Sequence, residues 1–242
     1  MTFKLLSYNI RDGGQGRLNL IAEVIQSQQP QAVALLEANS KPNAKALADT
    51  LGMHFAYGPA NSEFAIAWLS HLPIKRSHNH RLAVLAKTLL EVEVDWDGAP
   101  LSLFATHLIA GRTATAAHQR AVEVEAILDT MRLVGSRPHL LVGDFNAIHP
   151  DDPIGKPPPG EKQAYIARRP IERILEAGYT DCYRRQHPAA SGYTYTATHP
   201  WLRLDYIFVS PTIGDRLGQS DVVTGRKAAQ ASDHLPVWAE LM

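Results

Sequence analysis

Two short stretches that lie far apart in the chain carry side chains that could do acid–base or metal chemistry. Gly143-Asp144-Phe145-Asn146 supplies a carboxylate and an amide, and Ser232-Asp233-His234 supplies a carboxylate and an imidazole. Each stretch adjoins an apolar run that is typical of a strand, residues 139–142 before the first and residues 235–238 after the second. A strand end holds reactive groups on a rigid support while exposing them. The two stretches therefore indicate an active site.

Further polar residues stand at the ends of other strand-like runs. They are Asn9 after residues 5–8, Glu37 after residues 33–36, His107 after residues 103–106 and Asp205 before residues 206–209. With the two aspartates above, the strand ends carry four carboxylates and no cysteine. Such an oxygen-rich set suits a hard cation such as Mg²⁺ or Mn²⁺, whereas zinc more often recruits several histidines or cysteines. A metal with open positions can bind a phosphate oxygen, so the expected substrate is a phosphoester.

Hydrophobic periodicity assigns the elements that must position these residues. A period of two residues predicts strands, and apolar residues three and four positions apart predict helices. Strands are predicted at residues 3–10, 31–37, 54–57, 64–69, 74–81, 85–94, 101–107, 140–143, 204–210, 221–223 and 235–241. Helices are predicted at residues 18–28, 41–51, 113–133 and 171–177. The chain therefore begins with a βαβ unit.

The middle of the chain has a different pattern. Strands between residues 54 and 107 follow one another without room for helices, so antiparallel hairpins are expected, with one turn at Asp97-Gly98. The apolar face of the long helix that follows is predicted to consist of Ala117, Ala121, Val124, Ile127, Leu128 and Met131. Residues 149–170 are expected to be irregular, because Pro157-Pro158-Pro159-Gly160 fits neither a helix nor a central strand.

These elements predict an α/β (α+β) fold. Helix-linked strands in both halves, with hairpins between them, favour a four-layer αββα sandwich in which two mixed sheets pack face to face. Helices would cover the two outer faces. No internal repeat or linker divides the sequence, so we expect a single domain over residues 1–242.

The composition restricts the partners and the compartment. Lys plus Arg and Asp plus Glu each number 24, so the net charge is zero and a general nucleic-acid coat is not indicated. Cys182 is the only cysteine, which excludes an intramolecular disulfide and a thiolate zinc site. No apolar stretch approaches the roughly 20 residues needed to span a bilayer, and the N-terminus does not have the pattern of a signal peptide. We expect a cytoplasmic protein without a membrane span.

Six motifs in a fixed order give the sequence a resemblance to a known family. They are Ser7-Tyr8-Asn9-Ile10, Leu35-Leu36-Glu37, Thr106-His107-Leu108, Gly143-Asp144-Phe145-Asn146, Arg203-Leu204-Asp205-Tyr206-Ile207 and Ser232-Asp233-His234-Leu235-Pro236. The chain resembles the endonuclease/exonuclease/phosphatase superfamily, which includes DNase-type nucleases, abasic-site endonucleases, neutral sphingomyelinases and inositol-polyphosphate 5-phosphatases. The resemblance spans nearly the whole chain.

The resemblance implies a metal site. Glu37 would be the main ligand of Mg²⁺, for which Mn²⁺ could substitute, and Asn9 and Asp233 would lie at the same ion, directly or through water. The metal would polarise the phosphoryl oxygen and stabilise the charge that develops on the phosphorus and the leaving group.

The resemblance also implies catalytic roles. His234 would be the general base that takes a proton from the attacking water, and Asp205 would bind its other ring nitrogen. Asp144 is the alternative base, and the division between Asp144 and His234 stays open. Asn146 would orient the water or a phosphate oxygen, and His107 would donate to the phosphate.

Other conspicuous residues have simpler explanations. His71, His78 and His80 lie beside lysine and arginine residues whose charges oppose a cation, so a solvated hairpin is favoured over a metal site. Cys182 is expected to be a small, semi-buried residue, because no histidine and acid neighbour it in sequence to make it a nucleophile.

Three segments next to the strand ends could shape specificity. They are Ala110-Gly111-Arg112, the Pro-rich loop with Lys156, Lys162, Arg168 and Arg169, and residues 198–203. In the last segment, Trp201 and Arg203 could offer a stacking face and a phosphate partner to a nucleotide or a single strand. Trp201 could equally cover the core.

The leading hypothesis is a magnesium-dependent phosphoester hydrolase that acts by in-line attack of water on a phosphodiester, with DNA or RNA favoured as substrate. The zero net charge and the absence of a long basic or aromatic insertion keep a small-molecule or lipid-headgroup phosphatase or phosphodiesterase as the alternative. A non-catalytic binding module is disfavoured, because such a module needs no complete set of acid, base and metal residues. No obligate protein partner is evident.

Overall fold

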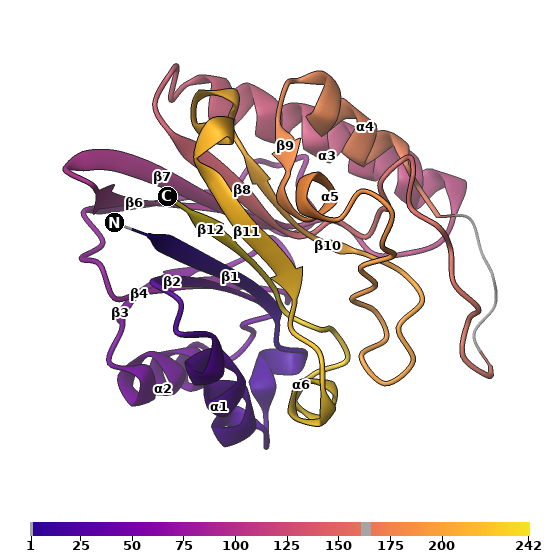
Figure 1. Cartoon of the computed structure of the whole chain (residues 1–242), viewed down its shortest axis with the longest axis horizontal. Helices are drawn as coiled ribbons and strands as arrows, with labels where there is room; N and C mark the ends of the chain where they lie inside the picture. The colour runs from indigo at the N-terminus through magenta and orange to yellow at the C-terminus, as the bar shows by residue number, and fades with distance from the viewer. Residues whose placement is uncertain (1, 161–165) are drawn as a thin grey trace.

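The strands form two six-stranded sheets in the computed structural model, which describes residues 2–160 and 166–242. The first sheet contains β1 (Phe3–Asn9), β2 (Ala32–Leu36), β3 (His54–Gly58), β4 (Ile66–Ser70), β11 (Leu217–Val222) and β12 (Val237–Leu241), in the order β11-β12-β1-β2-β4-β3. The second contains β5 (Arg76–His80), β6 (Leu89–Trp96), β7 (Ala99–His107), β8 (His139–Asp144), β9 (Thr180–Asp181) and β10 (Asp205–Val209), in the order β5-β6-β7-β8-β10-β9. Figure 1 shows the two sheets packed face to face.

Helices cover the outer face of each sheet (Figure 1). Against the first sheet lie α1 (Leu18–Gln28), α2 (Lys41–Leu51) and α6 (Arg226–Ala231). Against the second lie α3 (Ala114–Arg132) and α4 (Arg169–Glu176), while the short α5 (Cys182–Gln186) contacts β10 and β11. Two 3-10 helices, η1 (Asp12–Gly14) and η2 (Pro211–Arg216), complete the regular elements of the described chain. The predicted four-layer αββα sandwich is confirmed.

Both sheets are mixed, as expected. β1 and β2 are parallel and are connected through α1, and β7 and β8 are parallel and are connected through α3. The other neighbouring pairs are antiparallel. Because β10 and β12 run antiparallel to β8 and β1, their first residues lie at the same edge as the last residues of β1, β2, β7 and β8. This edge collects the polar strand ends.

Alternation along each strand separates two cores. Leu103 and Ala105 of β7 face the first sheet, and Phe104 faces α3 on the other side. The inner core is pinned by Trp68 of β4, whose indole Nε1 donates to the carbonyl of Leu90 in β6 at 3.1 Å. Since Trp68 is fully buried, this hydrogen bond between the sheets satisfies a polar group that water cannot reach.

The structure corrects three details of the predicted elements. The hairpin series is interrupted between β4 and β5, because the chain crosses there from the first sheet to the second. The buried face of α3 includes Arg120 and Glu123, and the predicted Ala121 is only half-buried. The short elements β9, α5 and α6 were not predicted, because stretches of two to six residues show no periodicity.

Candidate active site

Three of the predicted residues form a row across the second sheet. His107 on β7 pairs in register with Asp144 on β8, and Asp144 pairs with Asp205 on β10. Residues in register on neighbouring strands point to the same face. Ala105 and Val142, two positions earlier on their strands, belong to the core between the sheets. The row therefore continues the inner core to the sheet edge, where apolar side chains give way to polar ones.

A glycine sets the spacing of this row. A Cβ atom at Gly143 would lie 1.9 Å from the carbonyl oxygen of Thr106 on β7. Only glycine therefore allows β7 and β8 to approach each other at this level. The approach leaves Nε2 of His107 3.4 Å from Oδ2 of Asp144. Asp144 is fixed further by the backbone amide of Asn146, which donates to Oδ1 at 2.9 Å.

The first sheet contributes Asn9 and Glu37. Nδ2 of Asn9 donates to Oε1 of Glu37 at 3.1 Å and to Oδ2 of Asp144 at 3.2 Å, so this amide bridges the two sheets. Its Oδ1 accepts from the amide of Arg11 at 3.0 Å, and Oε2 of Glu37 accepts from the amide of Asp12 at 3.1 Å. Glu37 has a φ of 54°, an uncommon left-handed conformation that ends the alternation of β2.

The stretch before β12 brings the imidazole to the row. Oγ of Ser232 donates to the carbonyl of Asn9 at 2.6 Å, which ties this stretch to the end of β1. Nδ1 of His234 lies 2.8 Å from Oδ2 of Asp205, and because a carboxylate only accepts, this ring nitrogen is the donor. Nε2 of His234 lies 3.8 Å from Oδ2 of Asp144. Asp205 thus orients the ring toward Asp144.

Burial and neighbouring charges shift three pKa values. Burial would lower the pKa of His234, but the charges of Asp205 and Asp144 outweigh it and raise this pKa to about 10. Burial raises the pKa of Asp144 to about 6. Burial and the charges of Lys87 and His234 hold the pKa of His107 well below its usual range, so its ring is neutral at pH 7. Of Asp144 and His234, Asp144 therefore has the pKa closer to neutrality.

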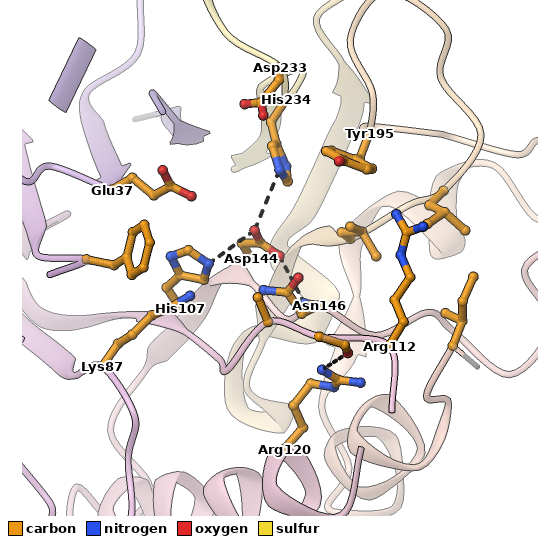
Figure 2. Close-up of a pocket in the computed structure, with 16 residues that line it drawn as sticks. Glu37, Lys87, His107, Arg112, Arg120, Asp144, Asn146, Tyr195, Asp233 and His234 are labelled. Carbon is orange, nitrogen blue, oxygen red and sulfur yellow. Dashed lines mark hydrogen bonds and ion pairs between the residues drawn. The ribbon is translucent and has the colours of Figure 1, made fainter. Parts of the chain in front are cut away.

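The predicted residues converge on one pocket. Those that line it are Glu37, His107, Asp144, Asn146, Asp233 and His234. Asn9 and Asp205 stand behind the lining and hold it through the hydrogen bonds above. Figure 2 shows the carboxylates of Glu37 and Asp233 on the same side of the His234 ring. All eight residues predicted from the sequence thus lie in or directly behind this pocket, although their roles stay predictions.

The donors of the site fit a hard divalent cation. Asp144, Asp205 and His234 each offer one ligand atom, and these atoms lie within 4.8 Å of one another. Glu37 and Asp233 add carboxylate oxygens in the same pocket. Oδ1 of Asp205 is buried without a hydrogen-bond partner within residues 2–160 and 166–242. Carboxylate and amide oxygens are the ligands that Mg²⁺ and Mn²⁺ prefer.

Sequence reasoning missed several residues around this pocket. Lys87, Arg120 and Tyr195 line it, and Glu123 lies just behind Arg120 on α3. Lys87 had a signal, because it stands two positions from the apolar residues 85 and 89 in the predicted strand of residues 85–94, although the structure places it in a bend before β6. Arg120 is spaced like the apolar face of α3, which is equally unusual for a charge. Tyr195, whose ring centre lies 4.9 Å from that of His234, had no such signal.

Of the segments proposed to shape specificity, residues 110–112 reach the pocket, whereas Trp201 and Arg203 of residues 198–203 are buried. Arg112 lines the pocket, and its guanidinium lies 5.0 Å from the ring centre of Trp201. Trp201 and Arg203 are both 0% exposed, so the idea that they offer a stacking face and a phosphate partner is wrong. Burial also excludes contact of either side chain with a strand in solvent. Trp201 covers the core.

Of the basic residues of the Pro-rich loop, Arg168 and Arg169 contact the protein itself, and Lys156 is exposed. Nη1 of Arg168 donates to the carbonyls of His149 and Pro150 at 2.6 Å each. Arg169 pairs with two glutamates of its own helix. Lys162 lies outside the described residues.

The structure places His71 and His78 at the surface, as a solvated hairpin predicts, while His80 on β5 is partly buried and lies 2.9 Å from Oε2 of Glu91. Cys182 is fully buried rather than semi-buried, and burial raises the pKa of its thiol, which makes it unreactive.

A β-sandwich with carboxylates, an amide and paired imidazole and carboxylate groups at one edge defines a hydrolytic class of site. The chain belongs to the Endonuclease/Exonuclease/phosphatase family, whose model matches residues 6–234. Because endonucleases, exonucleases and phosphatases all hydrolyse phosphoester bonds, the protein is a hydrolase of phosphoester bonds. None of the described helices is long and apolar enough to cross a membrane.

Individual relatives are distant. Exodeoxyribonuclease III of Haemophilus influenzae is 22% identical over 265 aligned residues, which cover 98% of this chain and 99% of the relative. The DNA repair nuclease APEX1 of Danio rerio is 30% identical over 113 residues, 42% of this chain and 35% of the relative.

Solved structures show the same fold. An AP endonuclease from Archaeoglobus fulgidus superposes with a TM-score of 0.81 at 18% identity, covering 98% of both chains. A variant of the 3′ phosphatase NExo from Neisseria, bound to a product DNA hairpin, superposes with a TM-score of 0.81 at 21% identity and 99% coverage of both chains.

Proposed function

We propose that the protein is a magnesium-dependent phosphodiesterase that hydrolyses nucleic acid by in-line attack of water. The observation that carries the proposal is the convergence of His234, Asp144 and Glu37 in one pocket, with Asp205 directly behind them. The names of relatives support a nucleic-acid substrate, because they include an exodeoxyribonuclease, an AP endonuclease and a phosphatase bound to DNA. DNA or RNA would be the partner, without an obligate protein partner.

Mg²⁺, or Mn²⁺ in its place, would be held by Glu37 with Asp233 and Asn9 at the same ion. Bound there, the ion supplies stabilisation of negative charge on the phosphoryl oxygens. In the orientation of the Asn9 side chain, Nδ2 faces the carboxylates of Glu37 and Asp144. Asn9 would therefore contribute mainly by holding the metal ligand Glu37 and the carboxylate of Asp144 in place.

The chain's own groups would activate the water and bind the phosphate. Asp205 fixes the ring of His234 through Nδ1, which directs Nε2 toward Asp144 and the pocket. The proton of the attacking water ends on the Asp144 and His234 pair. The neutral His107 and the amide of Asn146 orient the phosphoryl oxygens and the water.

A substrate panel tests this function. Purified protein is offered supercoiled plasmid, single-stranded DNA, RNA and bis-p-nitrophenyl phosphate with Mg²⁺, and then with EDTA. We expect hydrolysis of at least one polynucleotide, its loss in EDTA and its recovery with Mg²⁺ or Mn²⁺. Activity that EDTA leaves unchanged would contradict the proposed mechanism.

A small-molecule or lipid-headgroup phosphodiesterase is the second candidate. The zero net charge favours it, as does a pocket of about 310 Å³, which is near the lower limit of ordinary ligand sites. Salt separates the two candidates, because nucleic-acid binding weakens steeply with added salt through counterion release. A small substrate would show no comparable slope.

We also propose that residues 1–242 act as a single domain. The two sheets support this, because each contributes residues to the pocket and the Asn9 side chain joins them. The cytoplasmic location stays a prediction.

A further inference from the structure

We propose that Lys87 binds the phosphoryl group of the substrate and stabilises its negative charge during hydrolysis. This inference rests on the proposed phosphodiesterase function and adds a cationic ligand to the carboxylates, amide and imidazoles to which that function assigns roles. Lys87 precedes β6 and lines the same pocket as His107 and Asp144. Figure 2 shows it beside His107, on the side away from Asp233 and His234.

The burial of Lys87 requires an explanation. The residue is only 4% exposed, and an ammonium that leaves water costs several kcal/mol unless an opposite charge lies against it. No carboxylate oxygen within residues 2–160 and 166–242 lies within 4 Å of its Nζ. Its neighbours are the carbonyl of Leu108, which accepts from Nζ at 3.0 Å, and the ring of Phe64, whose centre lies 4.7 Å away.

This environment leaves the ammonium with donors to spare. Nζ carries three N–H groups, and Leu108 is the one hydrogen-bond acceptor that it contacts in the described chain. A phosphoryl group would supply both the missing negative charge and the missing acceptors. A charge-assisted hydrogen bond to phosphate is stronger than a neutral one, and most so in a site from which water is excluded.

The charges around Lys87 favour its protonated form at neutral pH. Burial lowers the pKa of Lys87 to about 8, while the carboxylates of Asp144, Glu37 and Glu123 oppose this decrease from a distance. The residue therefore carries its charge at pH 7 without being neutralised by contact. The ammonium group can therefore bind an anion.

Two buried residues of α3 fix the backbone around Lys87. Oε1 of Glu123 accepts from the amide of Ala86 at 2.7 Å, and Oε2 accepts from the amide of Ile109 at 3.0 Å. Nη1 of Arg120 donates to the carbonyl of Ile109 at 2.9 Å. These bonds hold the residue before Lys87 and the residue after its acceptor Leu108. Glu123 and Arg120 are thus positioning residues, and the ammonium is held in place before substrate arrives.

Packing alone does not explain a lysine here. Leu85 and Leu89, two positions before and after Lys87, are buried apolar residues, and Leu89 is the first residue of β6. A methionine at position 87 would fill a similar volume without burying a charge. The charge is therefore the feature to be tested.

The experiment compares Lys87→Met and Lys87→Arg with the wild-type protein. Lys227→Met is the matched control, because Lys227 has a side chain 70% exposed on α6, remote from the pocket. With bis-p-nitrophenyl phosphate and Mg²⁺, we expect Lys87→Met to reduce kcat by about 10²- to 10³-fold, with a smaller change in KM. Lys87→Arg should recover part of the loss, and Lys227→Met should match the wild type.

A binding measurement keeps this test independent of turnover. Inorganic phosphate in the presence of Mg²⁺ should raise the melting temperature of the wild type and of Lys227→Met, but not of Lys87→Met. Without phosphate, Lys87→Met should melt at or above the temperature of the wild type, because a buried unpaired charge has been removed. If this variant does not fold, Lys87→Gln takes its place in both measurements.

The outcomes separate failure of this inference from failure of the proposed function. Full kcat in Lys87→Met, together with an undiminished phosphate shift, would overturn the role of Lys87 and leave the phosphodiesterase intact. A wild type that hydrolyses no phosphoester but shows a Lys87-dependent phosphate shift would overturn the function and support the phosphate site. A wild type that phosphate does not stabilise at all would overturn the Lys87 site directly.

Discussion

Two buried groups of charged side chains flank the start of β10, and they differ in how completely their charges are paired. On one side, Asp205 joins His234 and Asp144 in the pocket, where Lys87 and an oxygen of Asp205 have spare bonding capacity. On the other side, Arg203, only two residues earlier, enters a network with Asp152, Asp181 and Arg184, which we name the Arg203 network.

In the Arg203 network, the charged groups are paired with one another. Nε and Nη2 of Arg203 donate to the two carboxylate oxygens of Asp152 at 2.7 and 3.0 Å. Nη1 lies 2.7 Å from Oδ2 of Asp181, an ion pair outside hydrogen-bond geometry. The guanidinium also lies 5.4 and 4.4 Å from the ring centres of Tyr183 and Tyr206. Every strong charge has a partner from the same chain, so this network stabilises the loop, α5 and β10 relative to one another.

The pocket is open by comparison. Asp205 lies 2.8 Å from the ring of His234, but Nε2 of that ring is 3.8 Å from Asp144, and no carboxylate within residues 2–160 and 166–242 lies within 4 Å of Nζ of Lys87. Such an arrangement costs stability and is expected where a ligand completes the pairing. The difference suggests a general distinction: buried charges that satisfy one another maintain the fold, and buried charges that do not are candidates for binding.

The largest expected effect is on kcat, and it comes from removing a charged side chain of the pocket. His234→Ala should reduce kcat on bis-p-nitrophenyl phosphate by about 10²- to 10⁴-fold, because the Asp144 and His234 pair that takes the proton of the water loses its imidazole. Its free energy of unfolding should also decrease, because the buried Asp205 carboxylate loses its hydrogen-bond donor. His78→Ala, at an exposed histidine of β5, is the control and should leave kcat unchanged. A His234→Ala protein with more than half the wild-type rate would refute the role.

Disrupting the Arg203 network should mainly lower the stability of the fold, not the rate of hydrolysis. Arg203→Met should lower the free energy of unfolding by about 3–5 kcal/mol, because the buried Asp181 loses its ion-pair partner and Asp152 keeps only Arg184. Urea denaturation measures the loss. Arg169→Met is the matched control, since Arg169 forms ion pairs at the surface and should contribute about 1 kcal/mol or less. Equal losses of unfolding free energy in the two variants would contradict the expected difference between buried and surface ion pairs.

A substitution at Glu123, which holds the backbone next to Lys87, should reduce both stability and kcat, each by a smaller amount. Glu123→Gln replaces one accepting oxygen by an NH₂ group opposite the amide of Ala86 or Ile109. The expected cost is about 1–3 kcal/mol in unfolding free energy, with a reduction of kcat that follows the misplacement of Lys87. Glu125→Gln, at the partly exposed neighbour on α3, is the control. A Glu123→Gln protein that loses stability but keeps full kcat would limit Glu123 to the fold.

The smallest expected effect concerns pH and the opposite end of β8. His139 accepts from the Tyr179 hydroxyl at 2.7 Å and donates to the Arg137 carbonyl at 2.7 Å as a neutral ring. Burial lowers its pKa below 6.5, so the folded state binds this proton less readily than the unfolded state. Its contribution to stability is present above pH 6.5 and is lost as the pH falls toward the lowered value. In His139→Gln, the unfolding free energy should fall less steeply between pH 7 and 5.

Much of the fold could be predicted from local patterns. The bounds of α1 and α2 match the prediction, because their apolar spacing is regular and Ser40 and Gly52 supply clear capping signals for α2. The strand ends also gave the site, since a polar residue after an apolar run is visible in one dimension. The assignment of strands to two sheets was less accessible, because the crossing between β4 and β5 is set by packing.

Long-range pairing explains what the sequence could not show. Arg203 follows Trp201 in a polar and aromatic stretch, which looks like a binding surface until Asp152 and Asp181 are brought against it. Lys87 is the opposite case. Nothing near it in the sequence indicates a pocket, and it lines one only because β6 lies beside β7 in the folded protein. Neither environment is encoded within a few residues.

The pairing of β1 with β12 has a practical consequence for handling the protein. Phe3 pairs in register with Leu241, so the two extremities of the polypeptide emerge side by side, as Figure 1 shows. Asn9 is at the other extremity of β1, about 20 Å away at roughly 3.3 Å per residue. A purification tag, a fluorescent fusion or a covalent tether joining both extremities would therefore sit well clear of incoming substrate.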